Sequence, residues 1–203
     1  MRVQSLAFLA LLSSADAFTA QQTASRSSAM FANVGIYYSS STGNTETVGG
    51  YIAEAAGGLE MTDIGDAKDE EIMALDSIIC GAPTWHTGAD EQRSGTSWDD
   101  WLYDQLPGLD LSGKKVAVFG VGDSESYSDY YCDAAGELHD LFKAKGATLC
   151  GYTSTEGYLH ESSKAEIEAG KFCGAMFDED NQYDLSEDRA KAWVDQLKGE
   201  GFF

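Results

Sequence analysis

The sequence predicts an α/β protein, a doubly wound sheet of five parallel strands with helices on both faces. Short apolar runs alternate with segments of helical character from residue 33 to the C-terminus. Such alternation is typical of parallel sheets with right-handed crossover connections. The apolar fraction of 43% is enough to build a core, and two Pro with 22 Gly fit one compact domain better than a linker-rich chain of 203 residues.

The strands are the short apolar or aromatic runs between turn residues. Five are expected, at residues 33–38, 59–64, 77–81, 115–120 and 147–152. The segment 153–171 interrupts the fifth strand, and the strand pattern resumes over residues 172–177. Helices are expected between them, at residues 45–56, 69–74, 97–106 with Ser97 as the N-cap, 129–145 and 186–198.

Residues 1–31 have the composition of a targeting presequence. Arg2, an apolar run over residues 6–12 and the Ala15-x-Ala17 site form the layout of a signal peptide covering about residues 1–17. Residues 18–31 are rich in Ser, Ala and Thr and contain no acid, as in transit peptides. The junction resembles the bipartite presequence of algae with complex plastids, which implies delivery to a chloroplast stroma. Plain secretion is the alternative, although the cysteines form no disulfide-like framework.

The net charge of −21 indicates which kinds of molecule the protein can bind. A strongly negative surface repels nucleic acid and anionic membranes and favours basic patches on proteins, unless the acids serve only solubility or a high-salt habitat. No stretch is long enough for a mature membrane-spanning helix. The four cysteines include no C-x-x-C pair, so no metal site is expected.

The first loop with unusual composition, residues 39–45, joins a predicted strand to a helix. Its hydroxyls and backbone N–H groups suit a phosphate, which the helix dipole also attracts. It contains no Lys or Arg and lacks the G-x-x-x-x-G-K-[ST] pattern of nucleoside triphosphate loops. It is therefore predicted to hold a phosphate monoester through neutral donors, unless it is an ordinary Ser/Thr turn.

Two further loops each carry an aromatic residue outside any helical or strand period. Trp85 lies within residues 81–88, and Tyr127 lies within residues 120–130, where glycines allow close approach of a ligand. Trp85 could stack on a planar ring or plug the core, and Tyr127 could lie on the surface instead. Ligands of doubly wound sheets bind beyond the carboxyl ends of the strands, so the three loops are expected at one edge.

Taken together, the three loops resemble the flavodoxin family. Residues 36–46 (IYYSSSTGNTE) look like the family signature in its S/T-x-T-G-x-T form, and residues 81–85 and 122–127 resemble its two flavin-sandwich loops. The resemblance extends over about residues 34–197, and the segment 153–171 is similar to the insertion of the long-chain class. It implies a flavodoxin-like domain over residues 32–203 with FMN as cofactor.

The resemblance also assigns roles to individual residues, none of them catalytic or metal-binding. Trp85 and Tyr127 would cover the two faces of the flavin ring, and Tyr130 and His86 stand where the family commonly has other residues. The expected FMN-binding residues are Ser40, Ser41, Thr42, Gly43, Asn44 and Thr45 around the phosphate, and Thr84, Trp85, His86, Thr87, Gly88, Gly122, Asp123, Tyr127 and Tyr130 around the ring.

By the same resemblance, the protein is a monomeric, low-potential one-electron carrier and not an enzyme. Its partners would be photosystem I as donor and ferredoxin–NADP reductase as acceptor, with the protein replacing ferredoxin when iron is limiting. The acids expected near the exposed flavin edge are Asp90, Glu91, Asp99, Asp100, Glu125 and Asp129.

Two other functions compete with electron transfer: a reductase on the same fold and a non-redox signalling module. An FMN-dependent NAD(P)H quinone or flavin reductase needs a nicotinamide pocket over the ring, where the two aromatics leave no room. A receiver module needs acids at the end of the first strand, where serines stand instead.

Overall fold

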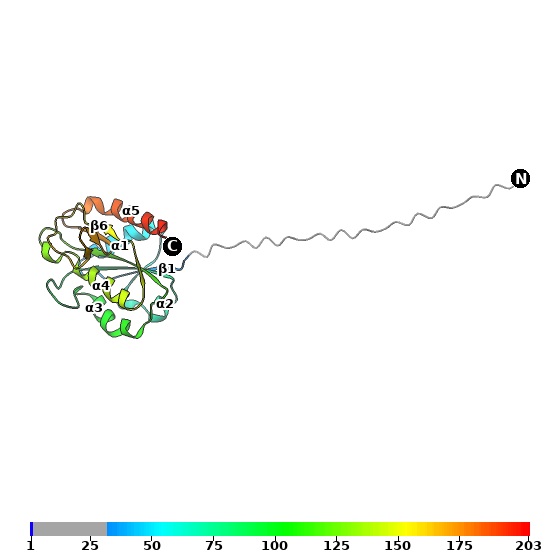
Figure 1. Cartoon of the computed structure of the whole chain (residues 1–203), viewed down its shortest axis with the longest axis horizontal. Coiled ribbons are helices and arrows are strands. Elements are labelled where there is room, and N and C mark those ends of the chain that lie inside the picture. Colours follow the sequence, from blue (N-terminus) through cyan, green and yellow to red (C-terminus); the bar gives the residue numbers. More distant parts are fainter. Residues whose placement is uncertain (2–31) are drawn as a thin grey trace. The chain divides into compact units, whose positions relative to one another are not determined.

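A parallel sheet with the strand order β2-β1-β3-β4-β5 forms the centre of the protein (Figure 1). The computed structural model describes Met1 and residues 32–203, so the predicted presequence, apart from Met1, lies outside the described residues. The strands are β1 (Val34–Tyr38), β2 (Met61–Asp63), β3 (Ser77–Pro83), β4 (Lys115–Val121) and β5 (Thr148–Cys150). The predicted five-stranded doubly wound fold is confirmed.

The fifth strand position is divided between two short strands. β5 pairs with the first half of β4, from Lys115 opposite Thr148, and β9 (Ala175–Phe177) pairs with its second half, from Phe119 opposite Ala175. The chain between them forms a small antiparallel sheet of β6 (Thr153–Ser154), β8 (Lys171–Phe172) and β7 (Glu166–Glu168). The predicted interruption of the fifth strand is confirmed, but the central strand resumes at Ala175 and not at residue 172, because Phe172 pairs within this small sheet.

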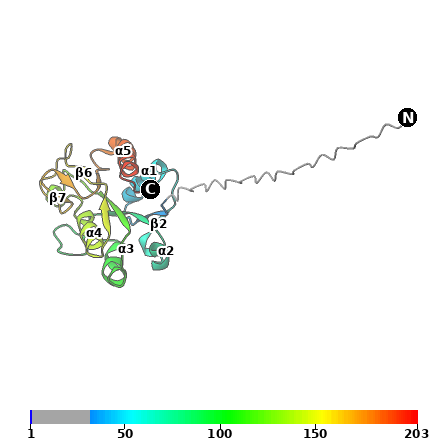
Figure 2. The same cartoon turned by 45° about the vertical axis from the view of Figure 1, so that its right-hand side comes forward.

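Helices cover both faces of the central sheet (Figures 1 and 2). One face carries α1 (Asn44–Ala55) and α5 (Ser186–Gly199), and the other carries α2 (Asp69–Met73), α3 (Ser97–Asp100) and α4 (Asp133–Ala144). Short helical turns η1 (Ile64–Asp66), η2 (Trp101–Gln105), η3 (Leu106–Gly108), η4 (Ser128–Tyr130) and η5 (Tyr183–Leu185) fill the connections.

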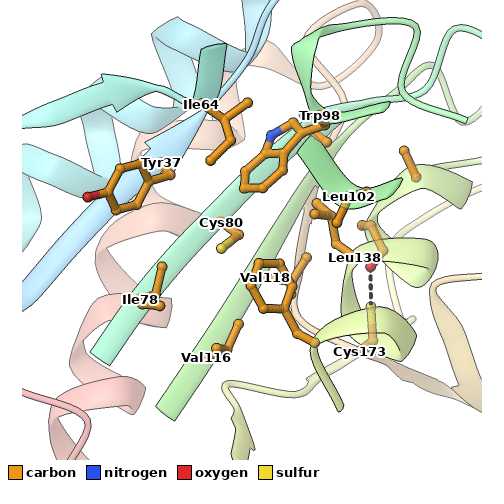
Figure 3. Packing of buried hydrophobic residues seen from close by; sticks show 14 of the residues in the cluster. Tyr37, Ile64, Ile78, Cys80, Trp98, Leu102, Val116, Val118, Leu138 and Cys173 are labelled. Atoms are coloured by element: carbon orange, nitrogen blue, oxygen red, sulfur yellow. Dashed lines mark hydrogen bonds between the residues drawn. The ribbon is translucent and has the colours of Figure 1, made fainter. Parts of the chain in front are cut away.

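The central strands β3 and β4 bury both of their faces, which explains their continuous apolar sequences. Figure 3 shows Cys80 of β3 and Val118 of β4 in one cluster with Trp98 and Leu138. The neighbouring Ile79 instead joins the cluster under α1 and α5. Successive side chains of a strand point to opposite faces, so one apolar run supplies two cores.

Two predicted helix boundaries are wrong for local reasons. The N-cap of α3 is Thr96, whose side chain accepts the N–H of Trp98 at 3.4 Å, and not Ser97. The helix α4 begins at Asp133 and not at residue 129. Cys132 before it has a φ of 55°, and such a left-handed residue separates η4 from the helix.

Gly81 of β3 must lack a side chain because Phe119 of β4 fills that space. A Cβ atom at residue 81 would lie 1.9 Å from the Phe119 ring. The carbonyl of Gly81 accepts the indole N–H of Trp98 at 2.7 Å. These contacts fix the strand immediately before the second of the three loops.

No helix in residues 32–203 is long and apolar enough to cross a membrane. Within this range, no group of three or more His, Cys, Asp or Glu side chains is arranged to hold a metal ion. All four cysteines are free; Cys80, Cys132 and Cys173 are buried, and Cys150 is partly buried.

Candidate functional site

A cavity of about 220 Å³ lies beyond the carboxyl ends of β1, β3 and β4. This is the edge where ligands bind in doubly wound sheets. Its walls come from all three predicted loops and from the segment after β9. The lining residues are Thr42, Asn44, Thr45, Pro83, Thr84, Trp85, Thr87, Val121, Gly122, Asp123, Tyr127 and Asp180.

The loop after β1 turns into α1 through Gly43, whose φ of 94° requires glycine. The N–H of Gly43 donates to the Ser40 hydroxyl at 2.9 Å, and the Gly43 carbonyl accepts the first N–H of the helical pattern, from Thr47. The N–H groups of the first helical turn have no intrahelical acceptor and carry a partial positive charge. Asn44 and Thr45 therefore present unpaired N–H groups at the cavity wall.

Thr45 shows most clearly that this wall is shaped for a ligand. Its side chain is 1% exposed, yet its hydroxyl has no hydrogen-bond partner among the described residues. A buried hydroxyl without a partner costs about 1–3 kcal/mol. Such an atom at a helix N-terminus fits the oxygen of an anion that enters the cavity.

The loop after β3 is held by its own backbone (residues 84–94, here named the Trp85 loop). The N–H groups of Trp85 and His86 both donate to the carbonyl of Arg93, each at 3.1 Å. The His86 Nδ1 lies 2.6 Å from the carbonyl of Gln92. Trp85 lines the cavity and is 51% exposed, which leaves the residue accessible to a planar ring.

The loop after β4 is shaped by Asp123. Its carboxylate accepts the N–H groups of Glu125 and Ser126, at 3.0 and 2.7 Å, and the side-chain amide of Asn181 at 2.8 Å. Partial burial raises the pKa of Asp123, but these hydrogen bonds outweigh burial and leave the pKa below its ordinary value. The turn presents Tyr127, 56% exposed, on the cavity wall.

Of the residues predicted to bind a cofactor, some line the cavity and others support it. The lining ones are Thr42, Asn44, Thr45, Thr84, Trp85, Thr87, Gly122, Asp123 and Tyr127. Ser40, Ser41, Gly43, His86, Gly88 and Tyr130 lie outside the lining; Ser40 bonds Gly43, and Tyr130 packs near Gly88. The binding role of each remains a prediction.

Pro83, Val121 and Asp180 also line the cavity, although no binding role is predicted for them from the sequence. Pro83 and Val121 end β3 and β4, and the rule that ligands bind at strand ends could have found them. Asp180 follows β9, whose pairing with β4 joins residues far apart in sequence. Partial burial, with Asp123 and Asp178 nearby, raises the pKa of Asp180.

The geometry defines an α/β protein with a mononucleotide-type site. An anion cradle of neutral donors and two exposed aromatics meet at the carboxyl edge of one parallel sheet. The Flavodoxin family model matches residues 36–193, and the chain belongs to the flavodoxin family.

Similar proteins extend this assignment across nearly the whole of residues 32–203. A flavodoxin of Haemophilus influenzae is 39% identical over 169 residues, covering 82% of this chain and 94% of the relative. A flavodoxin of Synechococcus elongatus is 40% identical over 174 residues, covering 83% and 98%. The crystal structure of Fusobacterium nucleatum flavodoxin bound to flavin mononucleotide matches with a TM-score of 0.73 at 28% identity, covering 82% and 97%.

Proposed function

We propose that the protein is a one-electron carrier that holds one FMN non-covalently in the cavity at the carboxyl edge of its sheet. The observation that carries the proposal is the buried, unpartnered hydroxyl of Thr45 in a wall that also presents Trp85 and Tyr127. Bound FMN would supply the redox chemistry, and the protein would supply its binding and its electrostatic environment.

The residues present fit a phosphate monoester at one end of the site. Thr45, Asn44 and Thr42 offer hydroxyl, amide and backbone donors at the start of α1. None of the lining residues is a Lys or Arg. Neutral donors and a helix N-terminus are suited to a single phosphate, whereas a polyphosphate usually also needs a cation.

The two aromatic residues fit an isoalloxazine ring at the other end. Trp85 and Tyr127 come from different loops, and both line the cavity while half of each remains exposed. A ring between them would lie with one edge toward solvent, where a partner can receive an electron. The carboxylates of Asp123 and Asp180 would disfavour added negative charge on the ring and hence lower its potential.

The partners we propose are basic redox proteins, by resemblance photosystem I as donor and ferredoxin–NADP reductase as acceptor. The net charge of −21 and the exposed acids of two cavity loops support this proposal. Asp90 and Glu91 are exposed in the Trp85 loop, and Glu125 and Asp129 are exposed in the loop after β4. Such acids would turn these loops toward a positive surface.

Asp99, one of the acids expected near the exposed flavin edge, is buried. Asp99 is 7% exposed, and its carboxylate accepts the N–H groups of Ser94 and Gly95 at 3.1 and 2.9 Å. The exposed acids that remain are Asp90, Glu91, Asp100, Glu125 and Asp129. We also propose that the chain is of the long-chain class, monomeric, and directed to a chloroplast stroma by residues 1–31.

A titration with FMN, riboflavin and FAD tests the binding proposal. We expect one FMN per chain, with much weaker binding of riboflavin, which has no phosphate, and of FAD. Equal affinity for riboflavin and FMN would contradict the role of the first loop. Rapid oxidation of NADPH with a quinone acceptor and no partner protein would instead identify a reductase.

Stopped-flow electron transfer to ferredoxin–NADP reductase across a salt series tests the docking proposal. Surface steering is screened over about 8 Å at physiological salt, so transfer should slow from moderate to high ionic strength. The variant Asp100→Asn/Asp129→Asn should show a shallower dependence on salt. An identical salt dependence in both proteins would mean that the negative charge serves solubility and not docking.

A further inference from the structure

We propose that Glu137, on the buried side of α4, is the positioning residue that sets where the Trp85 loop meets the flavin. The proposal rests on the FMN site proposed above. Glu137 does not line the cavity, and its effect would pass through the backbone of residues 84–94.

A continuous chain of hydrogen bonds joins Glu137 to the flavin-facing residues. One carboxylate oxygen accepts the N–H of Gln92 at 2.8 Å, and the other accepts the N–H of Arg93 at 2.9 Å. The carbonyl of Arg93 in turn accepts the N–H groups of Trp85 and His86. The carboxylate of Glu137 thereby holds the end of the loop directly and the start of the loop through Arg93.

The carboxylate itself is held firmly in place. The side chain of Glu137 is 4% exposed, and it accepts the Tyr103 hydroxyl at 2.5 Å in addition to the two N–H groups. The Arg93 guanidinium lies 3.7 Å away, and its side chain is 10% exposed. A buried carboxylate with this many donors is rigid, because any displacement leaves a charge or an N–H group unpaired.

The loop needs such an anchor at this point. Gln92 has a φ of 57°, a left-handed conformation that is uncommon for residues other than Gly, Asn and Asp. Strained residues persist when the surrounding contacts over-determine them. The hydrogen bonds that Glu137 accepts from Gln92 and Arg93 hold Gln92 in this conformation. The carbonyl of Gln92 also contacts the ring nitrogen of His86.

Thr84 adds a second link between the same loop and the same helix. Its hydroxyl accepts the N–H of Ala134, in the first turn of α4, at 3.0 Å. The start of the loop is therefore attached to the start of α4, and its return is attached one turn later at Glu137. The loop position thus follows α4, which is packed against the sheet.

The variant Glu137→Gln tests the inference because it keeps the shape and places an amide NH₂ where one oxygen stood. That NH₂ would meet a backbone N–H donor or the Tyr103 hydroxyl. A matched control is Glu166→Gln in β7, which makes the same substitution in the insertion. The carboxylate of Glu166 accepts the N–H of Gly170 at 2.8 Å. Glu166 does not line the cavity, and its hydrogen bonds are made within the insertion.

Two readouts are measured on the folded chain. Without FMN, the amides of Trp85 and His86 should exchange hydrogen faster in Glu137→Gln than in wild type. With FMN, the dissociation constant should rise about tenfold, the order expected for lost charge-assisted hydrogen bonds, and the two reduction potentials should move closer together. In Glu166→Gln, the exchange of these amides, the affinity and the potentials should match wild type.

Further variants separate position from charge. Glu137→Asp keeps the charge but is one methylene shorter, so it should also speed exchange and shift the potentials. Wild-type potentials in Glu137→Asp, with exchange still fast, would show that charge alone acts and would overturn the proposal. If Glu137→Gln does not fold, Tyr103→Phe decides, with faster exchange at Trp85 supporting the proposal and unchanged exchange overturning it.

Unchanged exchange and unchanged potentials in folded Glu137→Gln would also overturn the inference. A wild-type chain that binds no FMN would contradict the proposed function instead. In that case, the exchange measurement still decides whether Glu137 positions the loop.

Discussion

Replacing Thr45 by Val is expected to stabilise the FMN-free protein while it weakens FMN binding. The Thr45 hydroxyl is buried and has no partner among the described residues, so its removal relieves an unsatisfied polar group. Such a group costs about 1–3 kcal/mol. We expect the free energy of unfolding to rise by about 1 kcal/mol, which for a domain of this size raises the Tm by about 2–4 °C.

The loss of binding follows from the partner that the hydroxyl would gain. A hydrogen bond to a charged phosphate contributes about 1.5–3 kcal/mol, so the Kd for FMN should rise about 10- to 150-fold. Riboflavin lacks the phosphate, and its Kd should stay unchanged. Quenching of flavin fluorescence during titration measures both constants.

The control variant is Thr47→Val on the same helix. Its hydroxyl is exposed and already donates to the Gly43 carbonyl at 3.0 Å. Thr47→Val should not raise the Tm of the FMN-free protein. It should also leave the ratio of the dissociation constants for FMN and riboflavin unchanged. Equal weakening of FMN and riboflavin binding by Thr45→Val, or a lower Tm of the FMN-free variant, would contradict the role given to this hydroxyl.

Three further variants test the roles of Tyr127, Gly81 and Asp123. Tyr127→Ala should weaken FMN binding and raise the second reduction potential, because water would reach the ring; spectroelectrochemistry would show an unchanged potential if Tyr127 lies elsewhere. Gly81→Ala should lower the free energy of unfolding by at least about 1–3 kcal/mol, since its Cβ would lie 1.9 Å from the Phe119 ring. Urea denaturation measures this change. Asp123→Asn should lower stability at pH 7, and the difference should vanish in acid. Hydrogen bonds, outweighing burial, lower the native pKa of Asp123, so its contribution is present above the unfolded pKa near ~4 and lost as pH falls through the native value. An equal difference at both pH values would contradict the Asp123 role.

Local composition was enough to predict the parts of the site that lie within one loop. The hydroxyl-rich residues 39–45 and the out-of-period Trp85 and Tyr127 all follow strands of the central sheet. Parallel pairing then brings their loops to one edge. That inference needs only the strand assignments and the chirality of crossover connections.

What could not be predicted depends on contacts between distant residues. Asp180 reaches the cavity only because β9 takes over the pairing with β4 that β5 leaves. Asp99 looked like a surface acid of a first helical turn, but it accepts backbone N–H groups of the preceding loop and is buried. Neither pairing has a signal in local periodicity.

Glu137 is the clearest case of this kind. In the sequence it is one charged residue in a helical segment. Its role as an anchor depends on the return of the Trp85 loop to α4, at Gln92 and Arg93, more than forty residues earlier in the chain. A buried carboxylate that binds backbone N–H groups of a loop becomes visible only in three dimensions.

An anaerobic spectroelectrochemical titration of the protein reconstituted with one FMN tests directly whether this chain carries single electrons on a bound flavin. We expect two separate one-electron steps, with a long-wavelength absorption band between them and a second potential below that of free FMN. A single two-electron step at the potential of free FMN, or failure to retain FMN through gel filtration, would contradict it.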